Sequence, residues 1–431
     1  MTAESRRCTA ALVLAALPLL IPSAIADDRA DKVAYDRNQS LLENEMRAQQ
    51  TLMTPAILAK FQAVRREWNT LLVNGADARN AKDMEVIQAG LDYRLYALTG
   101  DIGPKALGVA LTAARRDLRT AGRQLQSARK ATFRRLVFDE ALIRIRKMLK
   151  SNFIGRSMAI ELLTDLEVVP RDPVNPRVRL EFHPEIDELF VEILNDPKQS
   201  DAVKTRVTNS VANFLQRGEI RPTDQEPIAR ALCREAGKKH TSVGYQDSLL
   251  WALEEFSIAR ELADEERPII MDVAASILTD PGRNILVRCH AAGVMGRAGF
   301  DGSTRYPATA WLAAKTTEEL FVAFASAKPA DRANRRWRNA ASHLLRCFRH
   351  WTKEERDSKD PGFPKGLMNR DARNQVVADA FKVVEPLIIE ILGGGPGPGA
   401  AAALQALGGW VGDSKPSELI YDAKSPPLAV N

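Results

Sequence analysis

The sequence has few of the residues on which small cross-linked or metal-dependent folds rely. It contains 4 cysteines and 5 histidines in 431 residues, and no Cys-x-x-Cys pair occurs. The sequence therefore lacks the usual motif for structural zinc sites, thioredoxin-type redox chemistry and c-type haem attachment. A chain of this length can bury a large core without disulfides. Beyond Cys8 only three cysteines remain, so they cannot all pair within one chain.

Catalytic motifs are absent as well. The sequence has no His-Glu-x-x-His, Gly-x-Ser-x-Gly or Gly-Lys-Ser/Thr motif. The glycine-rich residues 393–399 include prolines, which lack an N–H donor, and no lysine follows, so they favour a flexible connection over a phosphate loop. We predict no catalytic residue, no cofactor and no metal ion. An enzyme whose acidic residues form no recognisable motif is the alternative.

Long apolar runs are missing except at the N-terminus. Two arginines precede an apolar stretch, residues 8–25, which two prolines interrupt and which ends in Ala24-Ile25-Ala26. This order is typical of a secretory signal peptide, and the stretch is short for a membrane-spanning helix, which needs about 20 apolar residues. We predict cleavage near Ala26 and an exported chain, periplasmic or extracellular, without a transmembrane helix. An uncleaved anchor is the alternative.

Alternating runs typical of β-strands are scarce, whereas helical spacing of apolar residues is common, as in residues 186–194, 269–278 and 376–392. The sequence therefore predicts an all-α fold.

One helical pattern repeats. Apolar residues at its first, fifth and ninth positions recur at steps of 42 residues: Val203, Val207 and Val211; Tyr245, Leu249 and Leu253; Val287, Ala291 and Met295. At about 100° per residue these positions form one stripe on a helix. Fainter copies begin at Ile154 and Trp337, and a last one lies at residues 399–408. Each copy follows another helical run and a short turn, so the unit is two antiparallel helices that stack to share a core.

The pattern around Asp280-Pro281 and the Val-Arg-x-x-Ala-Ala of residues 287–292 resembles the HEAT-repeat family. The resemblance covers roughly residues 154–413 and implies an α-solenoid of stacked antiparallel helix pairs, preceded by a helical N-terminal region. It also implies a ladder pairing Asp196 with Lys204 and Asp280 with Arg288. HEAT-type iron hydroxylases use His-Glu pairs, and no His-Glu dipeptide occurs here.

The predicted organisation has four parts. A signal peptide covers residues 1–26, a helical N-terminal region covers 27–150, HEAT-like repeats cover 151–413, and a C-terminal tail covers 414–431.

Cys289 and His290 are adjacent in the repeats, and both are of residue types that bind metals. They occupy the third and fourth positions of the pattern, about 100° apart, so their side chains diverge. We predict ordinary contact between repeats, although a residue from another repeat remains a possible partner. His343 and His350 are two helical turns apart, too far for one ion.

Residues 105–150 are strongly basic, with 13 Lys/Arg and 3 Asp/Glu, whereas the whole chain has a net charge of +6. Helical apolar spacing continues through this segment, which predicts amphipathic helices with a basic solvent side. We take it as a candidate anion-binding surface, the alternative being a merely solvated face. Its candidate residues are Arg115, Arg116, Arg119, Arg123, Arg129, Arg134 and Arg135.

These observations favour an exported helical-repeat scaffold or adaptor that binds a protein or peptide partner. The alternatives are an enzyme built on the same scaffold, or a binder of an anionic polymer or lipid surface through the basic segment. Few aromatic residues lie among the arginines, which disfavours nucleic acid.

Overall fold

The structure is a computed structural model. It describes residues 29–47, 51–75, 80–100, 102–169, 181–216, 220, 222–239, 242–256, 268–297, 306–349, 366–370, 374–417 and 419. The predicted signal peptide, most of the predicted C-terminal tail, His240 and His350 lie outside the described residues.

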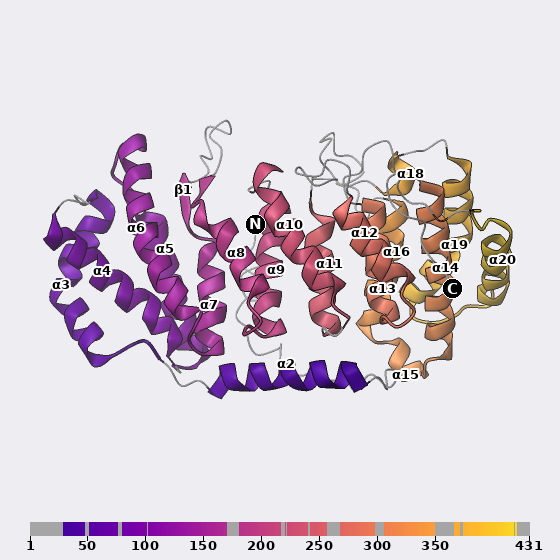
Figure 1. Ribbon diagram of the computed structural model, residues 1–431, viewed down its shortest axis with the longest axis horizontal. Coiled ribbons are helices and arrows are strands. Elements are labelled where there is room, and N and C mark those ends of the chain that lie inside the picture. The colour runs from indigo at the N-terminus through magenta and orange to yellow at the C-terminus, as the bar shows by residue number, and fades with distance from the viewer. Residues whose placement is uncertain are drawn as a thin grey trace. The chain divides into compact units, whose positions relative to one another are not determined.

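The described residues are almost entirely helical, which confirms the predicted all-α fold (Figure 1). One short antiparallel pair of strands, β1 (Glu167–Val169) and β2 (Glu181–Phe182), is the exception. The helices are α2 (Arg29–Arg47), α3 (Pro55–Asn74), α4 (Ala81–Tyr96), η2 (Ala97–Thr99), α5 (Gly103–Thr120), α6 (Ser127–Met148), α7 (Phe153–Leu163), α8 (Glu185–Asn195), α9 (Asp201–Gln216), α10 (Pro222–Gly237), α11 (Val243–Glu254), α12 (Ile269–Thr279), α13 (Ile285–Arg297), α14 (Tyr306–Ser326), α15 (Pro329–Arg332), α16 (Arg335–Phe348), α18 (Leu367–Arg370), α19 (Gln375–Gly393) and α20 (Ala400–Asp413).

The chain forms two compact units, Met1–Ser210 and Val211–Asn431. The division falls inside α9, so it lies within the region predicted to consist of repeats. Among the described helices, none is both long and apolar enough to cross a membrane.

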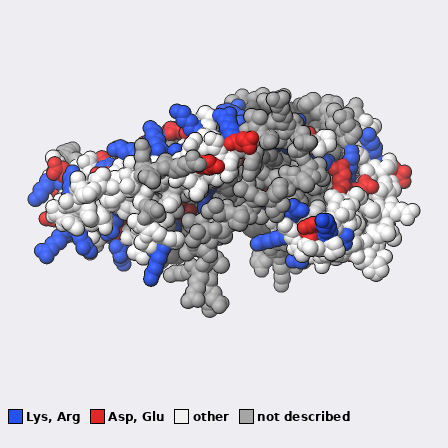
Figure 2. All heavy atoms as spheres, turned by 90° about the horizontal axis from the view of Figure 1, so that it is seen from below, with Lys and Arg blue, Asp and Glu red and all other residues white. Residues whose placement is uncertain are grey.

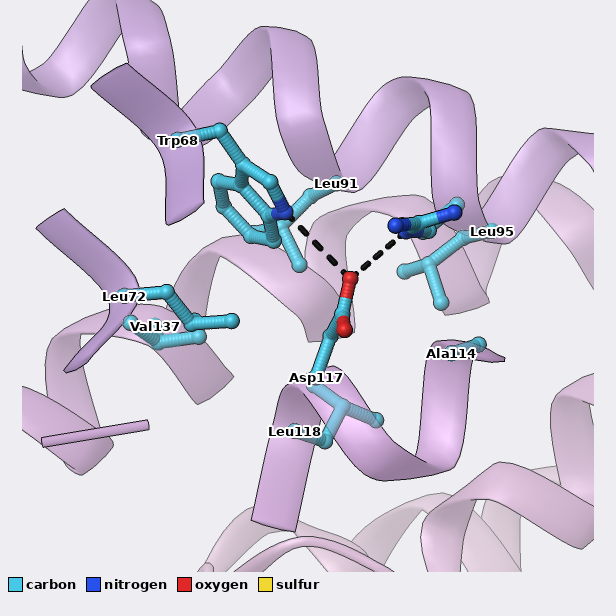
Figure 3. A pocket seen from close by; sticks show the side chains of 9 residues that line it. Trp68, Leu72, Leu91, Leu95, Ala114, Asp117, Leu118 and Val137 are labelled. Atoms are coloured by element: carbon cyan, nitrogen blue, oxygen red, sulfur yellow. Dashed lines mark hydrogen bonds and ion pairs between the residues drawn. The ribbon is translucent and has the colours of Figure 1, made fainter. Parts of the chain in front are cut away.

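In unit 1, helices α3 to α6 pack around a buried tryptophan (Figure 3). The Trp68 indole N–H donates to Asp117 at 3.3 Å, and Arg94 donates to the same carboxylate at 2.6 Å. Gly90 of α4 faces the indole ring, where a Cβ would come within 2.2 Å of a ring carbon. The pocket in Figure 3 is therefore filled by the protein's own tryptophan and leucine side chains.

Helix α2 caps α9 from outside the repeats. The Glu45 carboxylate is buried and accepts hydrogen bonds from the Ser200 backbone N–H at 2.9 Å and the Ser200 hydroxyl at 2.6 Å. Asn38 Oδ1 accepts from the Asp201 N–H at 2.8 Å. The first N–H groups of a helix have no partner within it, so these two side chains satisfy donors that α9 leaves free. Arg156 of α7 lies 3.2 Å from Glu45 and balances its charge.

In unit 2, the first helices pair as the repeat predicts. Helices α10 and α11, and α12 and α13, pack as pairs, and α11, α13 and α16 pack in succession. Helix α14 departs from the pattern, because it packs chiefly against α19 and α13 and less against α16. All three apolar pattern positions are buried in the copies that begin at Tyr245, Val287 and Trp337, and in the copy that begins at Val203, whose first two positions belong to unit 1. The copy at residues 399–408 does not follow the pattern, because Ala402 and Ala406 are exposed and Leu407 is the buried residue.

Two glycines bring α13 against α16. A Cβ on Gly296 would lie 2.3 Å from the Cys347 carbonyl oxygen, and one on Gly293 would lie 3.2 Å from that of His343. Real Cβ atoms do not approach backbone atoms as closely as Gly296 requires, so only glycine permits this crossing. The close approach places His343 beside the residues of α13 and α11.

Candidate functional site

Helices α11, α13 and α16 place two carboxylates and two imidazoles in contact. We call Asp247, Glu254, His290 and His343 the His–carboxylate cluster. Asp247 and Glu254 lie on α11, His290 lies on α13 and His343 on α16, so three successive repeat helices contribute. The rings of His290 and His343 stack, with centroids 3.5 Å apart and planes 19° apart.

Each ring has one nitrogen near each carboxylate. His290 Nδ1 lies 2.6 Å from Asp247 Oδ1, and His343 Nε2 lies 3.9 Å from the same oxygen. On the opposite edge, His290 Nε2 and His343 Nδ1 lie 3.4 Å and 3.6 Å from Glu254 Oε1. The contacts to Glu254 are too long for well-formed hydrogen bonds. The short Asp247–His290 bond is the firm link of the cluster.

Glu254 is completely enclosed, and arginines balance its charge. Arg346 Nη2 lies 2.9 Å from Glu254 Oε2, and Arg297 Nε lies 3.8 Å from it. Burial raises the pKa of this carboxyl, but Arg346 and the two histidines outweigh burial and hold the pKa well below its usual range. Glu254 is therefore a buried carboxylate anion. A Cβ on Gly293 would lie 2.8 Å from Glu254 Oε1, so this glycine also leaves room for the carboxylate.

The two imidazoles carry different charges. Burial lowers the pKa of His290, but Asp247 and Glu254 outweigh burial and raise it to about 9. Burial and the neighbouring charge of His290 both lower the pKa of His343, with Glu254 and Asp247 opposing them. The pKa of Asp247 is lowered, because His290 overcomes the effect of burial. At neutral pH the cluster thus pairs one imidazolium and one neutral ring with two carboxylates.

The side chains of Cys289 and His290 have different surroundings in the structure. Cys289 is fully buried, and burial raises the pKa of its thiol far above the ordinary value, so the thiol is neutral and unreactive. The His290 side chain contacts residues of two other repeats and not the side chain of Cys289. The prediction that the adjacent pair diverges is correct. The partners of His290, namely Asp247, Glu254 and His343, were not identified from the sequence.

The register of the repeat contains a signal for these partners. Asp247 and Glu254 occupy the third and tenth positions of their copy, His290 the fourth, and His343 the seventh. At 100° per residue, all of them fall between about 180° and 300°, away from the apolar stripe. A polar sector shared by neighbouring copies predicts that polar side chains of successive helices meet.

A second group of potential metal ligands lies in unit 1 and is made of Asp139, His183 and Glu185. His183 Nε2 lies 2.8 Å from Asp139 Oδ1, and its Nδ1 accepts from the Glu185 backbone N–H at 3.4 Å. Both ring nitrogens are therefore used within the protein. This arrangement links α6 to the start of α8, and the group offers a single imidazole.

The basic segment forms α5, the turn after it and α6, and its arginines divide into two groups. Arg115 lies 2.6 Å from Glu161 and 2.8 Å from Asp165, and Arg119 lies 2.6 Å from Asp165. Arg116 is exposed and only 3.5 Å from its neighbour Asp117. Arg123, Arg129 and Arg135 are exposed, and no described carboxylate pairs with them.

Arg134 does not belong to a solvent-exposed surface, contrary to the prediction. It is 1% exposed, and it donates to the backbone carbonyls of Glu167 at 2.6 Å and Arg119 at 3.0 Å. Its guanidinium also lies over the Phe138 ring. Arg134 follows Phe133 and precedes Val137, both core residues, so it lies on the inward side of α6. Its donors hold the end of α5 and strand β1.

The ladder implied by the HEAT resemblance is not formed at Asp280 and Arg288. Asp280 pairs with Lys239 at 2.8 Å, and Arg288 pairs instead with Glu319 at 2.5 Å. Asp196 accepts from the Lys198 N–H and the Gln199 amide.

No protein-family model matches the sequence, and no curated protein matches it.

Proposed function

We propose that this chain is an exported, HEAT-like helical-repeat scaffold that binds an acidic segment of a protein partner through unit 1. The binding surface is the corner formed by α5, the following turn and α6. We call Arg116, Arg123, Arg129 and Arg135 the corner arginines. Export and the HEAT relationship are parts of this proposal that the N-terminal sequence and the repeat pattern support.

The division of the arginines carries the proposal. Arg115, Arg144 and Arg146 of the same helices are paired with carboxylates, and Arg134 is buried against carbonyls. The corner arginines, by contrast, are exposed, and three of them have no described carboxylate partner. Figure 2 shows Lys and Arg side chains projecting from the edge of this unit. Unpaired like charges at one corner attract an anionic partner and steer its approach.

Apolar exposure beside the charges favours a protein partner over a uniform polyanion. Val109 of α5 is 66% exposed, and Ile102 before the helix is 44% exposed. Val109 and Arg116 are seven residues apart, two turns along the same side of the helix. A segment containing both acidic and apolar side chains satisfies both kinds of group, whereas a glycan or lipid headgroup array offers only charge.

The test is the binding of two fluorescent peptides to the purified chain, one of glutamates alone and one alternating glutamate with leucine, by anisotropy. We expect the mixed peptide to bind more tightly, and Val109→Ser to remove that difference. Reversing Arg123, Arg129 and Arg135 to Glu should weaken binding at least tenfold. Binding should also weaken with salt, since the Debye length falls from about 10 Å at 0.1 M to about 3 Å at 1 M.

The matched control reverses three exposed basic residues of unit 2, Lys328, Arg335 and Lys382. Its charge change equals that of the triple variant, and we expect less than a twofold loss. An equal loss in both variants would show that net charge alone drives binding. Tighter binding to heparin or anionic vesicles than to the mixed peptide would contradict a protein partner and indicate a polyanion or a membrane surface.

A further inference from the structure

We propose that Asp247, His290 and His343 of unit 2 form a binding site for one divalent transition-metal ion of the zinc class. One donor atom from each residue lies within 4.8 Å of the other two. This site is independent of the arginine corner and of the partner proposed for it.

The donor spacing is close to that of a coordinated ion. With metal–ligand bonds of about 2.0–2.1 Å, ligand atoms in a tetrahedral zinc site lie roughly 3.3 Å apart. Asp247 Oδ1 lies 2.6 Å from His290 Nδ1 and 3.9 Å from His343 Nε2, which brackets that spacing. The ion replaces the proton that lies between Asp247 Oδ1 and His290 Nδ1 in the hydrogen bond.

The far side of both rings has the arrangement that supports metal-binding histidines. Such a histidine almost always donates its second ring N–H to a carboxylate or carbonyl, which fixes the ring and makes the ligating nitrogen more basic. Here a single buried carboxylate, that of Glu254, faces His290 Nε2 at 3.4 Å and His343 Nδ1 at 3.6 Å. Arg346 on its other oxygen holds Glu254 in place.

The same atoms lack satisfied hydrogen bonds in the structure. His290 Nε2, His343 Nδ1 and Glu254 Oε1 are buried without a hydrogen-bond partner of good geometry. Native proteins rarely leave such atoms unsatisfied. An ion on His290 Nδ1 and His343 Nε2 leaves the remaining ring protons on His290 Nε2 and His343 Nδ1, the two nitrogens that face Glu254 Oε1.

Burial distinguishes the enclosed ligands from the open side of the site. The His290 side chain is 1% exposed, whereas that of Asp247 is 52% exposed. The ion therefore enters past Asp247, and three protein ligands leave a fourth position on the solvent side. Two imidazoles and one carboxylate suit zinc, nickel, cobalt or copper better than magnesium or calcium, which prefer oxygen ligands alone.

One ring must turn for both lone pairs to reach the ion. An imidazole lone pair lies in the ring plane, and the two ring planes are nearly parallel, 19° apart, with centroids separated by 3.5 Å, so one ion cannot lie in both planes. Rotation of the His343 ring about its Cβ–Cγ bond tilts its plane toward the ion. His343 is the less enclosed ring, since its side chain is 14% exposed against 1% for His290.

The experiment uses the untagged full chain, stripped with a chelator and then titrated with Zn²⁺ against a chromophoric zinc indicator. Co²⁺ is added separately, because its visible absorption reports nitrogen and oxygen ligation. We expect one tightly bound ion per chain and a Co²⁺ spectrum of four-coordinate type. Asp247→Asn should weaken binding at least tenfold, and Glu254→Gln about 10- to 100-fold through the loss of ring orientation.

The Asp247 side chain is half exposed and Asn has the same shape, so we expect its variant to keep the fold, which circular dichroism checks before titration. Asp139→Asn is the control, because it alters the other histidine–carboxylate group and should leave zinc stoichiometry and affinity unchanged. The proposal is overturned if the folded wild-type chain binds no zinc at micromolar concentration. It is equally overturned if Asp247→Asn and Asp139→Asn bind zinc as the wild type does, since the ion is then adventitious.

Discussion

His290 and His343 come from different repeats, yet their rings stack with centroids 3.5 Å apart between the carboxylates of Asp247 and Glu254. Ordinarily two stacked imidazoles repel when both are charged. Here only His290 carries the additional proton and the positive charge, and the neutral ring of His343 stacks against it. The packing of α11, α13 and α16 is thus coupled to a protonation state.

This coupling predicts that stability falls with rising pH when no metal is present. The folded-state pKa of His290 is raised from 6.5 to about 9, so its contribution is fully present below pH 6.5 and is lost as the pH rises through 9. The groups facing the ring are Asp247, Glu254 and His343. Behind Glu254, Arg297 and Arg346 pair with its carboxylate. Urea denaturation of the chelator-treated chain between pH 6 and 9.5 measures the effect.

Asp247→Asn serves as the comparison for the pH series. It removes the carboxylate that accepts from His290 Nδ1 and should flatten the pH dependence in this range. An identical slope in the wild type and this variant would assign the dependence to other groups.

The close crossing of α13 and α16 predicts opposite effects for two glycine-to-alanine changes. Gly296→Ala places a Cβ against the Cys347 backbone and should destabilise by about 1–3 kcal/mol. Gly108→Ala, inside α5 with no atom near its Cβ position, should stabilise by about 0.5–1 kcal/mol through helix propensity. Denaturant midpoints of the two variants measure both. Similar effects of the same sign would contradict the described crossing.

The repeat register predicts a large loss from a buried charge. Met295 is the ninth residue of its copy and is fully buried, so Met295→Asp should destabilise by more than about 4 kcal/mol. Val322→Asp, on α14 with the native side chain 48% exposed, should change stability by at most about 0.5 kcal/mol. Thermal melts of the pair give the comparison, and an unaltered melt for Met295→Asp would mean that the register is wrong.

The sequence was sufficient for the all-α fold and for the apolar stripe, because spacing along one helix determines which residues point inward. It was insufficient for the His–carboxylate cluster, because that cluster depends on how closely neighbouring helices approach. Gly293 and Gly296 set that approach, and a glycine in a helix does not reveal from sequence which helix it faces. The prediction for Arg134 was wrong because arginine is usually exposed, whereas its position beside Phe133 places it on the inward side of α6.

The caps supplied by α2 predict a local loss of protection. Glu45→Ala leaves the Ser200 N–H, its hydroxyl and Arg156 without their carboxylate, so the first turn of α9 and the docked part of α2 should open more easily. Each buried donor left unpaired costs about 1–3 kcal/mol. Hydrogen exchange should therefore accelerate at least tenfold in residues 36–46 and 200–203.

Asp36→Ala, at an exposed position of the same helix, provides the control for α2 and should leave exchange unchanged. Equal exchange in Glu45→Ala and the wild type would show that α2 does not depend on Glu45 for its position.

The proposed partner surface is tested most directly by a photo-crosslinking residue placed at Gln126, which is exposed in the turn between Arg123 and Arg129. The full chain is expressed in the cells that make it, and the same residue at exposed Ala401 of α20 serves as the reference. We predict a discrete protein adduct at position 126 whose crosslinked segment is rich in Asp and Glu, and no such adduct at position 401. Adducts of the same protein at both positions, or none at position 126, would contradict the assignment of the arginine corner as the binding surface.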